Sequence, residues 1–295
     1  MKSFFLVVGL MALFLGGAFR VEAAEPLSLD SAVSAASSTI GSFSPEAYGL
    51  AAAYVMTPKT RHELYAWQEH RVWPLASLTK LVSASVWAGK TVPWKSIITL
   101  RKVDEVGGGR LRVPVGTKIR FEDLWYASIT ASANNAAMVL ARVMGVSATR
   151  FVELMKLEAT KAGATTAVFA EPSGMSEKNA ASAKDMARMA DRAFSYRPLQ
   201  KAASTAAYTV RVLNGTPKER PIKTTNTLLS DDPDVWIIGG KTGYLEESRH
   251  NFVAWMRPVG VDGTPETGKD VLVVIFGAAT KEQSQAAAKH LANQV

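Results

Sequence analysis

The sequence predicts an α+β fold, in which both ends of the chain form one antiparallel sheet and the middle forms an inserted helical lobe. The first observation is a set of short runs rich in apolar residues, typical of strands, at 48–56, 63–67, 236–241, 252–256 and 271–276. The second is helical spacing of apolar residues over most of 121–203. The third is a final segment containing Ala and Lys, 281–294, which we expect to be a closing helix.

The composition is that of an ordinary globular protein. Of 295 residues, 47% are hydrophobic and 20% are charged, and this length allows one large domain or two small ones. The net charge is +8, but no run of five or more Lys or Arg occurs, so we expect no nucleic-acid partner. Cysteine is absent, which excludes disulfides, a lipoprotein thiol and a cysteine-based metal or redox site.

The N-terminus has the pattern of a secretory signal peptide. Lys2 supplies the positive start, Phe4–Leu15 the apolar core, and Val21–Ala24 a small-residue cleavage site. The apolar run is shorter than the roughly 20 residues that a membrane-spanning helix needs. An uncleaved anchor remains the alternative.

Three segments and an exported location follow from this N-terminus. We expect a signal peptide at 1–24, a linker at 25–44 with a weak helix over 29–38, and a single domain at 45–295. An exported protein without cysteine fits a bacterial periplasm or the cell exterior. The closing helix lacks a basic face with bulky apolar residues opposite, so we expect no stable membrane anchor after signal cleavage.

The domain begins with a hairpin that leads toward a helix. A turn at Thr57–Thr60 separates the first two strands, and Pro74 stands just before the expected helix start. A further strand is expected at 97–103. Gly107–Gly109 forms either a plain turn or the hinge of a flap over a site.

The middle of the domain is mostly helical. Helices are expected at 121–129, 136–144, 148–161 and 182–194. Ser182, with Asp185 three residues later, has the pattern of a helix start. We expect a short strand and turn at 168–175, and a hairpin turn at Asn214-Gly215. The strands of that hairpin are expected at 208–213 and 220–225.

Ser77 and Lys80 form the first motif that suggests chemistry. If a helix starts here, residues three apart share a face, so the Lys80 amine lies beside the Ser77 hydroxyl. A neutral lysine in that position could take the serine proton and activate the oxygen as a nucleophile. Alone, Ser-x-x-Lys also fits an ordinary surface serine and lysine.

Two later motifs change the interpretation. Ser132-Ala133-Asn134 lies between two apolar helices, and Lys241-Thr242-Gly243 lies near an apolar strand. The first could also be a helix N-cap, which Ser and Asn both favour. Each motif occurs once, and the order matches penicillin-binding proteins and serine β-lactamases. Over about 45–290 the sequence resembles the low-molecular-weight penicillin-binding proteins, which are D-alanyl-D-alanine carboxypeptidases and endopeptidases.

The resemblance implies a β-lactamase/transpeptidase fold with its site between the sheet and the helical lobe. It also implies an acyl-enzyme on Ser77, Lys80 as general base, and Ser132 as the proton donor to the leaving amine. The expected substrates are D-alanyl-D-alanine stem peptides of peptidoglycan, with β-lactams as acylating inhibitors and no cofactor or metal. Independently of the family, two lysines in one cleft lower each other's pKa, so one can act as a base near neutral pH.

The resemblance further assigns the substrate-binding groups. Asn134 is expected to hold the substrate backbone, and Lys241 to keep Lys80 neutral and hold Ser132. Thr242 is expected to bind a terminal carboxylate. Gly243 completes the third motif. The backbone N–H groups of Ser77 and Tyr244 are expected to form the oxyanion hole.

The sequence departs from the family near the end of the sheet. The family often carries an arginine just after its last core strand, where it binds the substrate carboxylate, but here the region is Gly277–Lys281. Arg249 or Lys281 could take its place, although a lone arginine is usually a solvated surface charge. The balance between carboxypeptidase and endopeptidase activity is therefore open.

Three other functions compete with this one. A class A-like β-lactamase is suggested by Glu171-Pro172, but Ser173-Gly174-Met175 replaces the expected Leu-Asn, and Ala133 replaces the expected Asp of Ser-x-Asn. A non-catalytic cell-wall binding module is disfavoured because every residue of the motifs is present. Metal hydrolysis is not expected, because the histidines lack paired spacing: His62, His70, His250 and His290.

Overall fold

The computed structural model describes residues 43–231 and 234–294. The expected signal peptide, the weak helix over 29–38 and nearly all of the linker lie outside these residues. No helix within the described ranges is both long and apolar enough to cross a membrane.

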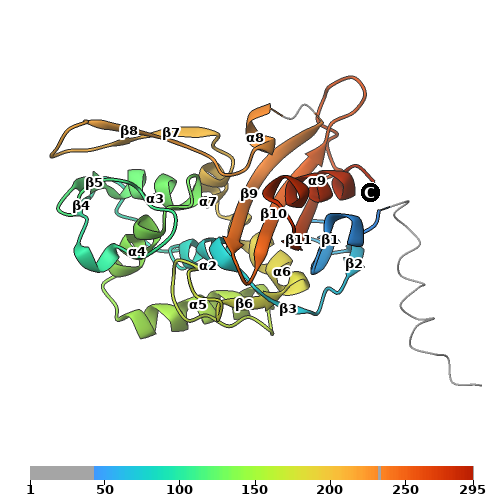
Figure 1. Ribbon diagram of the computed structural model, residues 1–295, viewed down its shortest axis with the longest axis horizontal. Helices are drawn as coiled ribbons and strands as arrows, with labels where there is room; N and C mark the ends of the chain where they lie inside the picture. The colour runs from blue at the N-terminus through green and yellow to red at the C-terminus, as the bar shows by residue number, and fades with distance from the viewer. Residues whose placement is uncertain (1–42, 232–233, 295) are drawn as a thin grey trace, which may run out of the picture. The chain divides into compact units, whose positions relative to one another are not determined.

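The core of the domain is a five-stranded antiparallel sheet (Figure 1). Its strand order is β2 (Glu63–Trp67), β1 (Ala52–Met56), β11 (Val271–Ala278), β10 (Arg249–Pro258) and β9 (Val235–Leu245). Two strands come from the start of the domain and three from its end. The predicted α+β fold, with one sheet built from both chain ends, is confirmed.

Both faces of the sheet are buried, which explains why its strands are nearly continuous apolar runs. On one face, Val55, Phe252 and Val273 belong to a core cluster with Leu291 of α9 (Lys281–Ala292). On the other face, the alternate residues pack toward the helical lobe, among them Tyr54, Val253, Trp255, Leu272 and Val274. In Figure 1, α9 crosses one face of the sheet while α6 lies behind the other.

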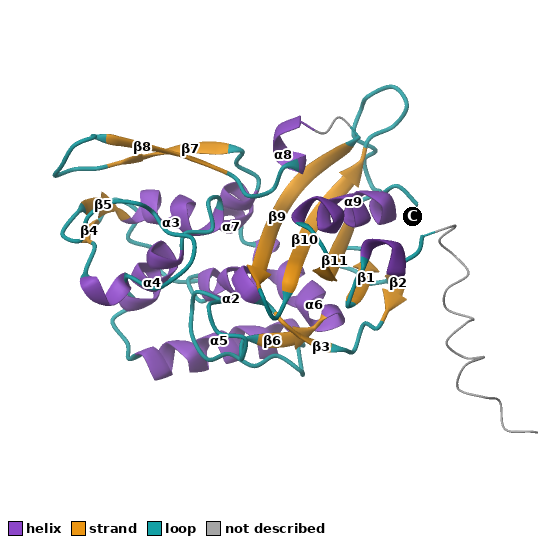
Figure 2. Cartoon of the chain, viewed as in Figure 1, coloured by secondary structure: helices purple, strands orange, loops and turns teal. Residues whose placement is uncertain are grey.

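The helical lobe lies between β3 and β9 in the chain (Figure 2). Its helices are α2 (Thr79–Ser85), α3 (Phe121–Ile129), α4 (Asn134–Arg142), α5 (Ala148–Ala162), α6 (Ala183–Ser195) and α7 (Arg197–Ala203). The four helices predicted in this region are present to within two residues at each end. The sequence patterns missed α7 and the short α8 (Leu228–Asp231).

Three small strand pairs complete the domain. They are β3 (Val72–Pro74) with β6 (Ala180–Ser182), β4 (Ile97–Thr99) with β5 (Lys118–Arg120), and β7 (Ala207–Arg211) with β8 (Glu219–Lys223). The first pair matters for the site, because β3 leads directly into the segment that carries Ser77.

Several predicted strands are shorter than expected, for local reasons. The segment 48–51 is not part of β1, because a 3₁₀ turn over Glu46–Tyr48 ends at Gly49 with a left-handed φ of 62°. The strand expected at 97–103 ends at Thr99, before a second 3₁₀ turn, Lys102–Asp104. The strand expected at 168–175 is only a single bridge between Val168 and Ala180.

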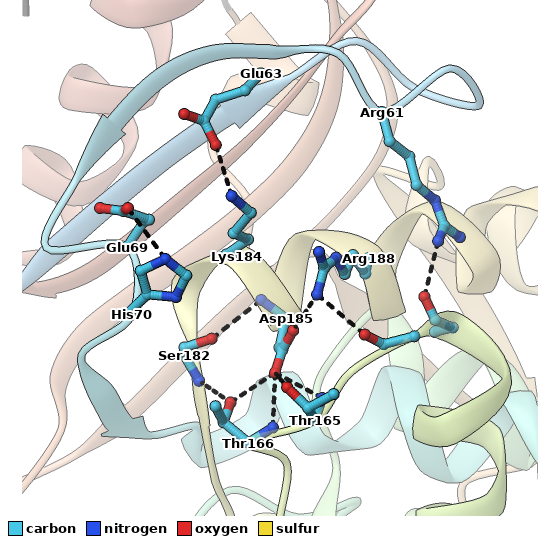
Figure 3. Close-up of polar contacts among 12 residues, drawn as sticks. Arg61, Glu63, Glu69, His70, Thr165, Thr166, Ser182, Lys184, Asp185 and Arg188 are labelled. Carbon is cyan, nitrogen blue, oxygen red and sulfur yellow. Dashed lines mark hydrogen bonds and ion pairs between the residues drawn. The ribbon is translucent and has the colours of Figure 1, made fainter. Parts of the chain in front are cut away.

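Helix α6 is anchored at its start by a buried carboxylate (Figure 3). Ser182 caps the helix, as predicted, by accepting a hydrogen bond from the Asp185 backbone N–H at 3.2 Å. The Asp185 side chain is free for other partners. Its Oδ2 accepts from the backbone N–H of Thr165 at 2.8 Å and of Thr166 at 2.7 Å, and its Oδ1 pairs with Arg188 at 2.8 Å. The first turn of α6 is thereby fixed to the loop after α5.

Two further ion pairs tie α6 to the β1–β2 hairpin (Figure 3). Lys184 Nζ lies 2.9 Å from Glu63 Oε2 of β2, and Arg61 Nε lies 3.0 Å from Asp191 Oδ2. Arg61, Lys184 and Arg188 each face a carboxylate. The network therefore holds the lobe on the sheet without leaving an unpaired charge among these residues.

Candidate active site

Ser77 and Lys80 lie on one face of a short helical segment. Ser77 belongs to a 3₁₀ turn, Ala76–Leu78, which runs directly into α2 and carries Lys80 one turn later. Lys80 Nζ donates to Ser77 Oγ at 2.9 Å, the arrangement that the three-residue spacing predicts. Ala76, just before the serine, has a φ of 49°, a strained conformation for a residue with a Cβ.

Lys80 is fully buried, and none of its hydrogen-bond partners among the described residues is a carboxylate. Besides Ser77, it donates to Asn134 Oδ1 at 2.6 Å and to the Ser173 carbonyl at 2.5 Å. Burial lowers the pKa of Lys80 from 10.5 to about 7, against an opposing effect of the Glu171 charge. An amine with this pKa is partly neutral near pH 7 and can accept a proton.

Ser132 and Lys241 meet from opposite sides of the site. Ser132 lies in the turn between α3 and α4, with a φ of 58°, and its hydroxyl oxygen accepts from Lys241 Nζ at 2.7 Å. Lys241 comes from β9, is also fully buried, and donates to the Thr242 carbonyl at 2.9 Å. Burial, with a smaller effect of the Lys80 charge, holds the pKa of Lys241 well below its usual range.

Asn134 joins Lys80 to the glycine-rich loop. It is the first residue of α4, and its Nδ2 donates to the Gly107 carbonyl at 2.7 Å. Its backbone N–H donates to the Gly109 carbonyl at 2.8 Å. Ala133, not Ser132 or Asn134, occupies the N-cap position, and no side chain caps this helix. The alternative in which this motif serves as a helix cap therefore does not describe the structure.

The β9 backbone approaches the nucleophile closely at Gly243. A Cβ built on Gly243 would lie 2.9 Å from the Leu75 carbonyl oxygen and 3.2 Å from the Ser77 nitrogen. Only glycine lets the strand come this near without displacement. Beside it, Thr242 Oγ1 donates to Thr225 Oγ1 at 2.6 Å, so the third motif is fixed against both the helix start and the segment after β8.

A cleft of about 770 Å³ lies beside Lys80 and Lys241, and residues that these lysines contact line it. It lies between β9 and the helical lobe, the location that the resemblance implies. Its lining includes residues of all three motifs and of the flanking loops: Ser77, Ser132, Asn134, Thr242, Gly243, Gly108, Gly109, Met175 and Tyr244. The glycine-rich loop thus forms part of the wall of the cleft.

The two candidates for the missing arginine lie in different surroundings. Lys281 lines the cleft together with His250, whose ring stacks on Tyr244 at a centroid distance of 4.5 Å. Arg249 is not among the residues that line the cleft, and its Nη1 donates to the Gly49 carbonyl at 3.2 Å. The expected role of Arg249 in substrate binding stays a prediction.

Glu171 has a structural role that the sequence did not indicate. Its carboxylate accepts from the backbone N–H groups of Ser173 and Gly174, each at 2.6 Å, and of Met175 at 2.8 Å. It also accepts from Asn179 Nδ2 at 2.9 Å. Because its oxygens accept hydrogen bonds from its own loop, Glu171 is not available as the general base that a class A β-lactamase would use. The sequence signal that could have indicated this role is a carboxylate directly before a Pro-Ser-Gly turn.

Comparison with known proteins agrees with this geometry. The family profile for D-alanyl-D-alanine carboxypeptidase matches residues 43–280. The chain belongs to this family. It is therefore a serine DD-peptidase, a hydrolase that acts on D-alanyl-D-alanine peptides of peptidoglycan and binds β-lactams, as the motifs predicted.

Among curated relatives of this DD-peptidase are two D-alanyl-D-alanine endopeptidases. One, from Haemophilus influenzae, is 28% identical over 209 residues, which are 70% of each chain. The other, from Pseudomonas aeruginosa, is 30% identical over 206 residues, which are 68% of this chain and 65% of the relative.

Solved structures share the fold of the DD-peptidase. A mutant of the Streptomyces K15 DD-transpeptidase superposes with a TM-score of 0.74 at 23% identity, over 83% of this chain and 96% of the other. A D-alanyl-D-alanine carboxypeptidase from Mycobacterium tuberculosis gives a TM-score of 0.70 at 22% identity, over 81% and 88%. The predicted transpeptidase-like fold is confirmed.

Proposed function

We propose that Ser77 is the nucleophile of this DD-peptidase and that Lys80 is its general base. The observation that carries the proposal is the 2.9 Å contact between Lys80 Nζ and Ser77 Oγ, made by a fully buried amine. Because burial lowers the pKa of Lys80 to about 7, a large fraction of the amine is neutral at physiological pH. Its lone pair then accepts the serine proton.

Acylation joins Ser77 to the penultimate D-alanine. As Oγ attacks the carbonyl carbon, Lys80 takes the hydroxyl proton and the carbonyl oxygen becomes an oxyanion. We assign the backbone N–H groups of Ser77 and Tyr244 to stabilise it, which the close approach of Gly243 to Ser77 supports. The C–N bond then breaks, and the leaving amine receives its proton through Ser132. Water finally hydrolyses the ester and frees Ser77.

The remaining motif residues are proposed to bind the substrate. Asn134, held between Lys80 and the Gly107 carbonyl, would contact the peptide backbone. Thr242 would bind a carboxylate or carbonyl group of the substrate, with the Gly243 backbone beside it. Lys241 would position Ser132 and oppose protonation of Lys80 by its charge.

We further propose that cross-link cleavage dominates over trimming of the terminal D-alanine. The usual arginine after the last core strand is replaced by Gly277–Lys281, so a free terminal carboxylate has a weaker anchor. A cross-linked substrate does not need that anchor. The names of the two curated relatives, both D-alanyl-D-alanine endopeptidases, support the same choice.

Digestion of purified muropeptides tests this proposal. Conversion of cross-linked dimers to monomers, at a higher rate than loss of alanine from monomeric pentapeptide, is the expected result in mass spectrometry. Loss of one alanine from the pentapeptide, with dimers left intact, would show a carboxypeptidase instead. The Ser77→Ala variant is the control for both products, and it should also lose covalent labelling by a fluorescent penicillin.

The segments before the domain are proposed from the sequence pattern alone. Residues 1–24 would be a cleaved signal peptide and 25–44 a linker, so the mature enzyme would lie in the periplasm or outside the cell. N-terminal sequencing of protein purified from an exporting host tests this. A mature chain beginning at Ala24 or Glu25 is expected, and a chain that retains Lys2 contradicts it.

A further inference from the structure

The loop that contains Glu171 contacts the catalytic segment at three points. The Ser173 carbonyl accepts from Lys80 Nζ at 2.5 Å, and the Pro172 carbonyl accepts from Ser83 Oγ of α2 at 2.5 Å. At Gly174, a Cβ would lie 2.1 Å from the Ala76 carbonyl oxygen. The loop therefore packs against the peptide that joins Ala76 to Ser77, in addition to contacting the general base.

One peptide group connects Glu171 to Lys80. The Ser173 carbonyl and the Gly174 N–H belong to the same peptide, and they point to opposite partners. The N–H donates to Glu171 Oε1 at 2.6 Å, while the carbonyl accepts from Lys80 Nζ. Hydrogen bonds in such a chain polarise one another, so an anionic acceptor at one end makes the carbonyl at the other end a better acceptor.

We propose that Glu171 is a positioning residue for acylation, which acts on Lys80 through the Ser173–Gly174 peptide and holds the loop against Ala76–Ser77. The proposal rests on the function proposed above, in which Lys80 is the base. It assigns Glu171 no contact with substrate. Its carboxylate would fix where the amine lies and would stabilise the protonated form that Lys80 reaches during serine attack.

The charges around Lys80 give this role a measurable signature. Among the described residues, the charged group that raises the pKa of Lys80 is Glu171, from the loop before β6, and it opposes the effect of burial. The charge of Lys80 in turn lowers the pKa of Lys241 on β9. Removing the Glu171 charge leaves the effect of burial unopposed, so protonation of Lys80 becomes less favourable. The acidic limb of the acylation profile should therefore move to lower pH.

The test compares Glu171→Gln with Glu177→Gln, a matched loss of charge on the same loop. Glu177 is exposed, so its variant should match the wild type. The readout is the second-order rate constant for acylation by a fluorescent penicillin from pH 5 to 9. For Glu171→Gln we expect a loss of roughly tenfold to a hundredfold at pH 7, as for a displaced catalytic group. We also expect the acidic limb to move down by about half a pH unit.

A second variant separates charge from anchoring. Glu171→Asp keeps the charge and shortens the side chain, so its rate should fall while its acidic limb stays near that of the wild type. If Glu171→Gln loses rate but its limb does not move, or if it matches Glu177→Gln, the proposal is overturned. If Glu171→Gln does not fold, Glu171→Asp alone decides. An acidic limb that stays at the wild-type pH in Glu171→Asp supports the proposal, and one that moves to lower pH overturns it. Failure of the wild type to be acylated would instead contradict the proposed function.

Discussion

Two polar clusters in this molecule differ in how their charges are paired. Along α6, the partly exposed cations Lys184, Arg188 and Arg61 each face a carboxylate at 2.8–3.0 Å (Figure 3). Beside the cleft, Lys80 and Lys241 are buried, and their partners among the described residues are hydroxyl, amide and carbonyl oxygens. The first cluster is balanced in charge and joins elements, whereas the second is unbalanced and holds a reactive amine.

Burial alone does not explain why Asp185 and Lys80 behave differently. Asp185 is almost as buried as Lys80, yet hydrogen bonds from Thr165, Thr166 and Arg188 outweigh burial and lower the pKa of its carboxyl. For Lys80, burial dominates and also lowers the pKa. A lowered pKa has opposite consequences for the two groups, because it keeps the acid Asp185 charged and makes the base Lys80 neutral. The partners therefore decide whether a buried ionisable group stabilises the fold or serves as a base.

The largest expected effect comes from making the unpaired amine permanently charged. Lys80→Arg places a guanidinium, which stays protonated in proteins, where a proton acceptor is needed. We expect acylation by penicillin to slow by about 10²- to 10⁴-fold, the usual contribution of a general base. Single-turnover labelling measures this. The matched control is Lys184→Arg, which keeps its ion pair with Glu63 and should acylate at the wild-type rate. A Lys80→Arg rate within a few fold of wild type would contradict the proposed base.

The converse change removes the central carboxylate of the paired cluster. Asp185→Ala leaves Arg188 and the backbone N–H groups of Thr165 and Thr166 without their acceptor. Arg188 is partly exposed, so the lost ion pair contributes little. Each backbone N–H left without an acceptor costs about 1–3 kcal/mol, so the free energy of unfolding in urea should fall by about 2–4 kcal/mol. Acylation measured well below the melting temperature should change little. Asp262→Ala, on an exposed loop, should leave the unfolding midpoint unchanged.

A fall in acylation larger than the change in the folded fraction would contradict the separation between the two clusters. In that case the α6 anchor would also control the cleft. Rates at two temperatures below the transition would reveal this, because a purely structural effect disappears where both proteins are fully folded.

The dependence of stability on pH should show the cost of the unpaired lysine. A base whose pKa is lowered from 10.5 to about 7 on folding binds fewer protons when folded than when unfolded. Stability therefore rises with pH between these values. The contribution from Lys80 is about 2 kcal/mol between pH 7 and 9. Urea unfolding should show that the free energy of unfolding of the wild type rises relative to that of Lys80→Met over this interval. An unchanged difference would mean that Lys80 folds in its charged form.

Much of the fold followed from local patterns. Short apolar runs located the five core strands, and helical spacing located α3 to α6. The strand predictions that were wrong failed because tertiary contacts, which no local pattern contains, determine the structure there. The strand expected at 97–103 ends at Thr99, whose carbonyl accepts from Arg142 Nη2 of α4 at 3.1 Å, and Asp104 after it pairs with the same arginine at 2.6 Å. The segment 168–175 is an irregular loop because the carboxylate of Glu171 collects its backbone N–H groups.

The site was predictable where a motif fixes the spacing and not where the fold brings residues together. Ser77 and Lys80 are neighbours on one helical segment, so their contact follows from the sequence. The contact between Ser132 and Lys241 joins residues 109 positions apart, and only the order of motifs suggested it. The sequence placed Lys281 at the start of the closing helix, but no local pattern shows that this helix start lies at the cleft.

The smallest expected effect distinguishes Lys281 from Arg249. Because Lys281 lines the cleft while Arg249 donates to the Gly49 carbonyl, we expect Lys281→Gln to raise KM for a D-alanyl-D-alanine peptide with a free carboxylate. The increase should be about tenfold or less, since a partly exposed cation contributes a single charge-assisted hydrogen bond. Arg249→Gln should leave KM nearly unchanged. The reverse order would support the prediction for Arg249. If neither variant changes KM, the free carboxylate has no cationic anchor at these positions, as an enzyme that cleaves cross-links would allow.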